Sequence, residues 1–108
     1  MHPYVRFPAV HGDHVVFVSD DDLWSTRFDG GSTRRLTANQ GVVSHPVFSP
    51  NGRCIATLST RDGTAEVYVS DADGGAPVRL TWGSQAVGVC GFTPDGEHIV
   101  YSSAKGQP

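Results

Sequence analysis

Ser44 and His45 are adjacent in the sequence, and a serine beside a histidine is the pair that nucleophilic hydrolases use. The serine of such enzymes also needs a sharp turn and a base within hydrogen-bonding reach. Because neighbouring residues of an extended strand point to opposite faces, we expect these two side chains to diverge. The segment 82–85 (Trp-Gly-Ser-Gln) lacks the second glycine of the Gly-x-Ser-x-Gly turn, so we predict no catalytic residue.

His11, Asp13 and His14 form a short cluster of potential metal ligands. A zinc site needs three or four converging ligands, and no further cluster is visible in the sequence. The stretch 8–14 also occupies the place that tight turns take in the later copies of a repeat, described below. We therefore expect a hairpin turn here and predict no metal site.

Acidic residues gather at two other places. The segment 71–74 (Asp-Ala-Asp-Gly) looks like the beginning of a calcium loop, but the position of its final glutamate is taken by Trp82. Asp20, Asp21 and Asp22 form the densest acidic run, and two interpretations stay open for it. The run is either a solvated loop or a rim that attracts the free amino terminus of a peptide. No cofactor is predicted.

The composition excludes several classes of function. The 108 residues carry a net charge of −3 and a pI of about 5.9, so no strong field exists to hold nucleic acid or an anionic membrane. No apolar run approaches the roughly 20 residues of a membrane span, and the first residues do not resemble a signal peptide. We expect a cytoplasmic protein, in which Cys54 and Cys90 are reduced and buried.

An internal repeat determines the architecture. An offset of 44 residues carries 23–31 onto 67–75, 48–52 (Phe-Ser-Pro-Asn-Gly) onto 92–96 (Phe-Thr-Pro-Asp-Gly), and Arg-Leu-Thr at 35–37 onto an identical Arg-Leu-Thr at 79–81. An earlier match pairs 14–17 with 54–57 at an offset of 40, so four extra residues lie in the polar loop 59–64. An insertion confined to a loop is what a repeated structural unit shows.

Each copy consists of short apolar segments separated by Asn-Gly, Asp-Gly or Gly-Gly turns, which suit tight hairpins. The predicted strands are about 4–10, 14–19, 22–28, 33–37, 43–49, 54–59, 65–70, 77–80, 86–93 and 98–103. A four-stranded unit of about 40–45 residues is typical of a β-propeller blade.

We therefore predict an all-β fold in which residues 1–108 form a single partial β-propeller. Its four-stranded antiparallel sheets are blade one at about 4–37, blade two at about 43–81 and a partial blade three at about 86–108. About two and a half blades of an incomplete propeller cannot close a ring by themselves.

Aromatic residues recur with the repeat, as Trp24 with Tyr68 and Phe48 with Phe92, and we expect them in the core between blades. Replacing Phe48 by alanine is predicted to cost about 3–5 kcal/mol where the blades are stacked. The partial blade leaves a strand edge and apolar faces uncovered. The isolated chain is therefore expected to be marginally stable or to oligomerise.

The two Pro-(Asn/Asp)-Gly phrases and the Val-Tyr-Val-Ser-Asp…Gly-Gly…Arg-Leu-Thr pattern at 67–81 resemble the TolB-like propeller repeat. The N-terminal part narrows the resemblance. The stretches 6–13 (Arg-Phe-Pro-Ala-Val-His-Gly-Asp), 16–18 and 21–24 (Asp-Asp-Leu-Trp) are similar to the beginning of tricorn proteases. The resemblance spans essentially all of the chain.

The resemblance implies a large cytosolic serine peptidase that acts on oligopeptides and assembles into homo-oligomers. In that family two propellers act as peptide filters or channels, and the catalytic residues lie far beyond the region matched here. We expect this chain to be a non-catalytic N-terminal segment, with peptides and the remaining blades as its partners. Two alternatives stay open, a TolB-like interaction module without peptidase activity and a short protein that closes a ring by self-association.

Overall fold

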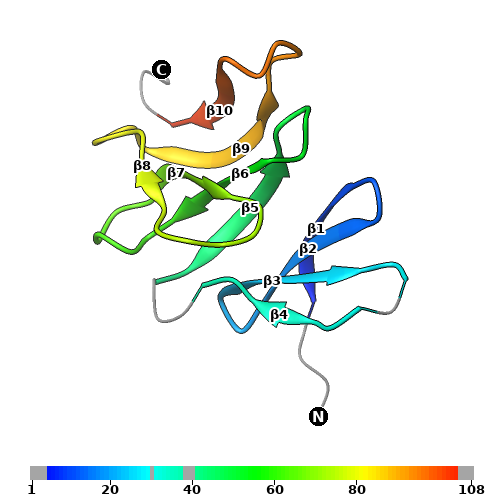
Figure 1. The fold of residues 1–108 in the computed structure, drawn as a ribbon. Helices are drawn as coiled ribbons and strands as arrows, with labels where there is room; N and C mark the ends of the chain where they lie inside the picture. The colour runs from blue at the N-terminus through cyan, green and yellow to red at the C-terminus, as the bar shows by residue number, and fades with distance from the viewer. Residues whose placement is uncertain (1–4, 30, 38–40, 105–108) are drawn as a thin grey trace.

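The computed structural model describes residues 5–29, 31–37 and 41–104, in which the chain forms ten β-strands (Figure 1). The strands make two four-stranded sheets and one two-stranded sheet, and every pairing is antiparallel. These described residues contain no helix, and hence none that is long and apolar enough to cross a membrane. The predicted all-β fold is confirmed.

Blade one consists of β1 (Arg6–His11), β2 (His14–Ser19), β3 (Asp22–Arg27) and β4 (Arg34–Arg35), in spatial order β1-β2-β3-β4. A two-residue turn joins β2 to β3, and its residues Asp20 and Asp21 have φ angles of 52° and 67°. Aspartate tolerates this left-handed region better than most residues do. Two successive positive φ angles twist the turn in the sense that the paired strands require.

Blade two consists of β5 (Val43–Phe48), β6 (Cys54–Ser59), β7 (Glu66–Asp71) and β8 (Val78–Arg79), in the same order. The turn from β5 to β6 is held by Asn51, whose Oδ1 accepts hydrogen bonds from the Ser49 hydroxyl at 2.8 Å and the Arg53 amide at 2.9 Å. Gly52 closes this turn with a φ of 74°. The repeated Pro-(Asn/Asp)-Gly phrase is therefore a hairpin motif.

The third sheet contains only β9 (Ala86–Phe92) and β10 (Ile99–Ser103). Its turn repeats the same contacts, because Asp95 accepts hydrogen bonds from the Thr93 hydroxyl and the Glu97 amide. All ten strands lie where the repeat predicts them. Three parts of the prediction lie outside the described residues. They are the start of the first strand at Tyr4, Gly30 in the repeated Gly-Gly turn, and the hairpin expected at residues 105–108.

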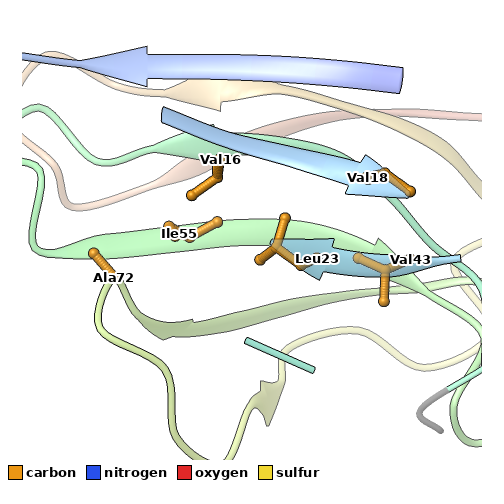
Figure 2. Packing of buried hydrophobic residues seen from close by; sticks show 6 residues of the cluster. All are labelled: Val16, Val18, Leu23, Val43, Ile55 and Ala72. Atoms are coloured by element: carbon orange, nitrogen blue, oxygen red, sulfur yellow. The ribbon is translucent and has the colours of Figure 1, made fainter. Parts of the chain in front are cut away.

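The apolar core lies between the sheets. One cluster joins blade one to blade two, and Figure 2 shows its six buried members, which are Val16, Val18, Leu23, Val43, Ile55 and Ala72. A second cluster joins blade two to the third sheet through Ala56, Leu58, Val67, Ala86 and Val89. Phe48 packs against the first cluster and Phe92 against the second, which confirms their predicted place between blades.

Burial changes systematically along the repeat. Val16 of β2 and Ala56 of β6 occupy equivalent positions facing the next sheet, and each is 0% exposed. Val100, at the same position of β10, is 50% exposed, because no described residue covers that face. Tyr68 faces blade one and is 2% exposed, whereas its counterpart Trp24 is only half-buried on the outer face of blade one. The sheets are thus built to be covered on both faces.

Candidate functional site

The first strands of the three sheets form one continuous surface. β5 contacts both β1 and β9, so the edge at which each sheet begins lies beside the corresponding edge of its neighbour (Figure 1). In a β-propeller, blades surround a central channel. The surface made by β1, β5 and β9, called here the inner surface, is therefore the part of the chain best placed to meet a ligand in that channel.

A bulge shapes the inner surface at two equivalent places. Phe7 in β1 and His45 in β5 have φ angles of 50° and 54°, each precedes a proline, and the strand register shifts there. The bulge corrects our expectation for the serine and histidine pair. The side chains do meet, with the Ser44 hydroxyl 2.9 Å from Nδ1 of His45, because the alternation of faces is interrupted where the backbone turns left-handed.

The imidazole of His45 lies between two neighbouring strands. On the β1 side its ring centroid is 4.5 Å from that of Phe7. On the β9 side it approaches Gly88, where an added Cβ would stand 3.3 Å from Cδ2 of His45. The result is a row of Phe7, His45 and Gly88 across the three inner strands. Within the described residues no carboxylate hydrogen-bonds to His45, so this pair has no orienting third group of the kind a catalytic triad uses.

A cavity of about 490 Å³ opens beside this row, lined by Arg6, Phe7, Val18, Ser19, Asp20, Asp21, Val42, Val43, Ser44 and His45. Asp20 and Asp21 are exposed on its wall, whereas Asp22 is buried and makes internal contacts. The acidic run is thus divided, and only its first two carboxylates could face a ligand. The rim interpretation is wrong for Asp22.

Asp22 is held by the Arg-Leu-Thr segment of its own blade. Thr37 donates a hydrogen bond of 2.8 Å to Oδ1 of Asp22 and accepts one of 3.0 Å from the amide of Leu23, while Arg35 pairs with Oδ2. Glu66 makes the same contacts with Thr81 and Arg79 in blade two. We call this arrangement the acid clamp. It consists of an acid at the first position of a blade's third strand, an arginine 13 residues later and a threonine 15 residues later.

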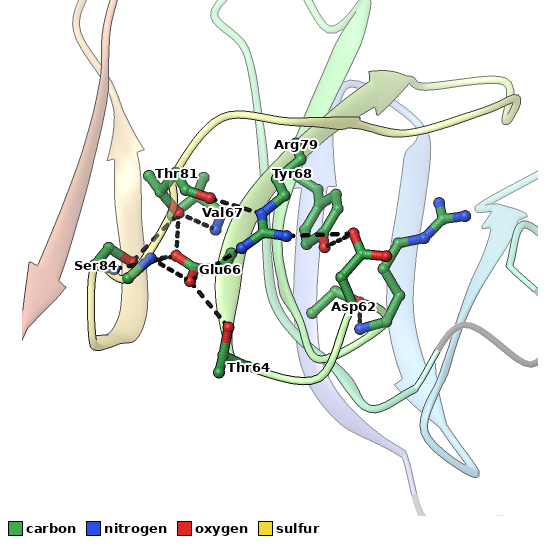
Figure 3. A network of polar contacts seen from close by, with 11 residues as sticks. Asp62, Thr64, Glu66, Val67, Tyr68, Arg79, Thr81 and Ser84 are labelled. Atoms are coloured by element: carbon green, nitrogen blue, oxygen red, sulfur yellow. Dashed lines mark hydrogen bonds and ion pairs between the residues drawn. The ribbon is translucent and has the colours of Figure 1, made fainter.

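The acid clamp of blade two extends into the loop that leads to β9 (Figure 3). Glu66 is 0% exposed, and its carboxylate accepts hydrogen bonds from the Ser84 hydroxyl at 2.6 Å, the Thr81 hydroxyl at 2.7 Å and the Gly83 amide at 2.7 Å. These hydrogen bonds, with that from Ser84 the strongest cause, lower the pKa of Glu66 from 4.5 to about 2. Ser84 is therefore a structural residue and not an exposed hydroxyl.

The sequence reasoning missed the acid clamp, although a signal for it was present. The Arg-Leu-Thr segments are identical in the two copies, and an acid stands at the same distance before each of them. A buried carboxylate requires a cation and hydrogen-bond donors around it. The arginine and threonine of each Arg-Leu-Thr segment, at a fixed distance after the acid, are groups that can supply them.

The candidate metal ligands His11, Asp13 and His14 instead lie in and beside the hairpin turn between β1 and β2, where each has a different partner. Nε2 of His11 lies 3.0 Å from the carbonyl oxygen of Pro50 in blade two, His14 contacts the hydroxyl of Ser25, and Asp13 pairs with Arg27 at 3.0 Å. Burial lowers the pKa of His14. Across residues 5–29, 31–37 and 41–104 no group of three or more His, Cys, Asp and Glu side chains could hold a metal ion.

The remaining predicted residues are placed as follows. Asp71 begins an ordinary turn, in which its carbonyl oxygen accepts a hydrogen bond of 3.0 Å from the Gly74 amide. Both cysteines are free thiols, but their predicted burial is wrong: Cys54 is half-buried and Cys90 is exposed. Cys90 lies where the register between β9 and β10 shifts, so the bulge carries its side chain out of the core.

Comparison with known proteins gives consistent matches over most of the chain. Residues 2–108 match the family described as tricorn protease N-terminal beta propeller domain. The chain is 45% identical over 101 residues to tricorn protease homolog 1 of Streptomyces coelicolor, covering 93% of this chain and 10% of that protein. It is 37% identical over 107 residues to the tricorn protease of Thermoplasma acidophilum, covering 90% of this chain and 10% of that protein.

A solved structure shows the same arrangement. The crystal structure of the tricorn protease superposes with a TM-score of 0.80 at 35% sequence identity, covering 94% of this chain and 11% of that one. The chain therefore spans about one tenth of the length of the relatives it matches.

Proposed function

Because the chain belongs to the family of tricorn protease N-terminal β-propeller domains, we propose that it is a non-catalytic part of a cytoplasmic serine peptidase that degrades oligopeptides. In this proposal the chain acts as a peptide filter or channel wall, or as a scaffold for one. Peptides reach it through the longer protein, and the remaining blades and further subunits are its protein partners. No nucleic acid, membrane or cofactor takes part.

The observation that carries the proposal is the continuity of the inner surface across β1, β5 and β9. This surface is neither smooth nor purely apolar. It presents an imidazole that contacts an aromatic ring on one side and a serine hydroxyl on another, with two exposed carboxylates on the wall of the adjoining cavity. Extended peptides carry apolar, hydrogen-bonding and ammonium groups, and such a mixed surface can contact all three.

The test uses the full-length peptidase and compares hydrolysis of a short fluorogenic peptide with that of a long oligopeptide. His45→Trp narrows the inner surface, whereas Val78→Trp adds the same bulk to an exposed position of β8. We expect His45→Trp to lower kcat/KM for the long peptide by about tenfold, which is about 1.4 kcal/mol, and to leave the short peptide nearly unchanged. Val78→Trp should affect neither.

Equal loss for both peptides would indicate a general disruption, and no loss for either would remove the filter role. A full-length protein that hydrolyses no peptide would instead favour the alternative, a TolB-like interaction module without peptidase activity. In that case a protein partner retained by the wild-type propeller, and released by His45→Trp, would identify the inner surface as a binding face.

A further inference from the structure

The turn that follows β2 differs from the equivalent places in the other two sheets. The second strand of each sheet ends in a serine, which is Ser19, Ser59 or Ser103. The hydroxyl of Ser59 accepts a hydrogen bond of 3.2 Å from the Arg61 amide, and that of Ser103 donates to the carbonyl oxygen of Ser84. The two later serines therefore use their hydroxyls inside the fold.

Ser19 is buried without such a partner. It is 4% exposed, and its hydroxyl makes no hydrogen bond to any residue that the structure describes. Its carbonyl oxygen accepts a hydrogen bond of 3.1 Å from the indole of Trp24, so the backbone is satisfied while the side chain is not. A buried hydroxyl without a partner costs free energy, and a ligand that bonds to it would remove that cost.

Ser19 lines the cavity of about 490 Å³ beside the inner surface, together with Asp20 and Asp21. Both aspartates are exposed, and neither carboxylate forms an ion pair with a described residue. Their turn is anchored to blade two, because the amide of Val43 donates a hydrogen bond of 3.0 Å to the carbonyl oxygen of Asp21. Two available carboxylates thus stand on a fixed turn next to an unpaired hydroxyl.

The charge of the cavity favours a cationic ligand. Its lining contains one further charged side chain, that of Arg6, whose guanidinium carbon lies 4.8 Å from the centre of the Phe7 ring. Two carboxylates against one guanidinium leave an excess of negative charge, and such a cavity attracts positive groups.

The mixture of polar groups selects among cations. The α-ammonium of a peptide stands beside a carbonyl oxygen, which needs a hydrogen-bond donor, whereas the ammonium of a lysine stands at the end of a methylene chain. The cavity supplies acceptors in Asp20 and Asp21 and donors in Arg6 and the hydroxyl of Ser19. A peptide amino terminus can use both kinds of group, but a lysine side chain can use only the acceptors.

We propose that this cavity binds the free amino terminus of an extended peptide. The carboxylates of Asp20 and Asp21 accept hydrogen bonds from the α-ammonium group, and the hydroxyl of Ser19 bonds to the first residue of the peptide. The following residues contact Phe7 and His45 on the inner surface. The proposal rests on the proposed function, because its ligands are oligopeptides, and it adds which end of the peptide this chain recognises.

The test measures binding by the full-length protein after a serine-directed fluorophosphonate has inactivated its peptidase. Fluorescence anisotropy compares three tetrapeptides that carry the same C-terminal fluorophore. The first is unblocked tetra-alanine, the second is its N-acetylated form, and the third is N-acetyl-Lys-Ala-Ala-Ala. We expect the unblocked peptide to bind at least about tenfold more tightly than either acetylated peptide.

The variant Asp20→Asn with Asp21→Asn should remove this preference. Asparagine keeps the shape of aspartate and tolerates the left-handed φ angles of the turn, but it carries no charge. The matched control, Asp73→Asn with Glu97→Gln, removes the same charge from exposed positions outside the cavity and should keep the preference. A preference that survives in the Asp20 and Asp21 variant would overturn the proposal.

Ser19→Ala separates a ligand contact from a structural role. It should weaken binding of the unblocked peptide about threefold or more without lowering the free energy of unfolding, because the hydroxyl has no internal hydrogen bond to lose. Ser59→Ala is the control, since it removes the acceptor of the Arg61 amide and should lower stability but not peptide binding. Unchanged binding in Ser19→Ala would overturn the proposal.

The site and the proposed function can fail separately. If the unblocked and acetylated peptides bind alike, or none binds, the site is wrong, while the effect of His45→Trp on hydrolysis still tests the filter role. If no peptide is hydrolysed but the unblocked tetrapeptide is preferred, the site stands and the peptidase role is wrong. Equal binding of the unblocked peptide and the acetylated lysine peptide would also overturn the proposal, because the cavity would then accept any cation.

Discussion

The hydroxyl of Ser84 donates a hydrogen bond of 2.6 Å to Oε1 of Glu66, 18 residues earlier in the chain. The bond fastens the loop that leads into the third sheet to a fully buried carboxylate of blade two (Figure 3). Neighbouring sheets are therefore joined by a polar contact in addition to their apolar clusters. A buried charge is tolerated only where such hydrogen bonds and ion pairs surround it.

Glu66→Gln should destabilise the chain by about 2–4 kcal/mol, because the amide keeps the shape of the side chain but loses the charge and leaves hydroxyl and amide donors unpaired. Chemical denaturation measures the loss. Glu97→Gln is the matched control, since Glu97 is exposed and its side chain makes no contact comparable to those of Glu66. If Glu66→Gln lowers the free energy of unfolding no more than Glu97→Gln does, the acid clamp does not contribute to stability.

The stability of the chain should fall as the pH drops from about 4.5 towards 2. The pKa of Glu66 is about 2 in the folded chain and 4.5 ordinarily, so its contribution is complete above pH 4.5 and is lost as the folded carboxylate takes up its proton. Denaturation curves recorded through this range measure the loss. In Glu66→Gln this part of the pH dependence should be absent, and an unchanged acid profile in that variant would assign the slope to other carboxylates.

Phe48→Ala should cost about 3 kcal/mol, at the lower end of the range expected from the sequence, because Phe48 is only partly buried against the first cluster. Its ring centroid lies 5.1 Å from that of His14 and 5.8 Å from that of His11, both in blade one. Phe28→Ala is the control, since Phe28 is 69% exposed and should change stability by less than about 0.5 kcal/mol. A loss below about 1 kcal/mol for Phe48→Ala would contradict its place between the blades.

Gly52→Ala should cost more than Gly96→Ala, although the two glycines close equivalent turns at φ angles of 74° and 75°. Both substitutions force alanine into the left-handed region, which costs about 1–2 kcal/mol. At Gly52 the new Cβ would also stand 2.3 Å from Nδ1 of His11, whereas at Gly96 the nearest atom is 3.7 Å away. Thermal melts of the two variants should differ by several degrees, and equal melting temperatures would mean that His11 moves aside freely.

The sheets could be predicted from the sequence because the same pattern of strands and turns occurs in more than one copy. Turn phrases such as Phe-Ser-Pro-Asn-Gly return at a fixed offset, and hairpins depend on local residue chemistry, so the strands follow. The acid clamp was harder to predict because the acids differ, Asp22 in one copy and Glu66 in the other, and because their partners stand 13 to 15 residues later, across a hairpin. The fixed spacing is a sign of the contact in the sequence, but it does not say which side chains meet or that they are buried.

The inner surface illustrates a different limit. The Ser44 and His45 contact depends on a backbone bulge, and the sequence offers only a proline after the histidine as a sign of it. Strict alternation along a strand is a good rule until one residue departs from the extended region. The exposure of Cys90 has the same origin. In both cases the error concerns which way a side chain points and not which strand contains it.

The acid clamp also imposes an order on synthesis. Asp22 and Glu66 stand first in their clamps, and Thr37, Thr81, Gly83 and Ser84 all follow them in the chain. As the polypeptide leaves the ribosome, the carboxylate of each clamp stays hydrated, and it can be buried only after the arginine and threonine that hold it have emerged. The clamp of blade one is complete at Thr37, before Glu66 has emerged, so blade one can close before blade two exists.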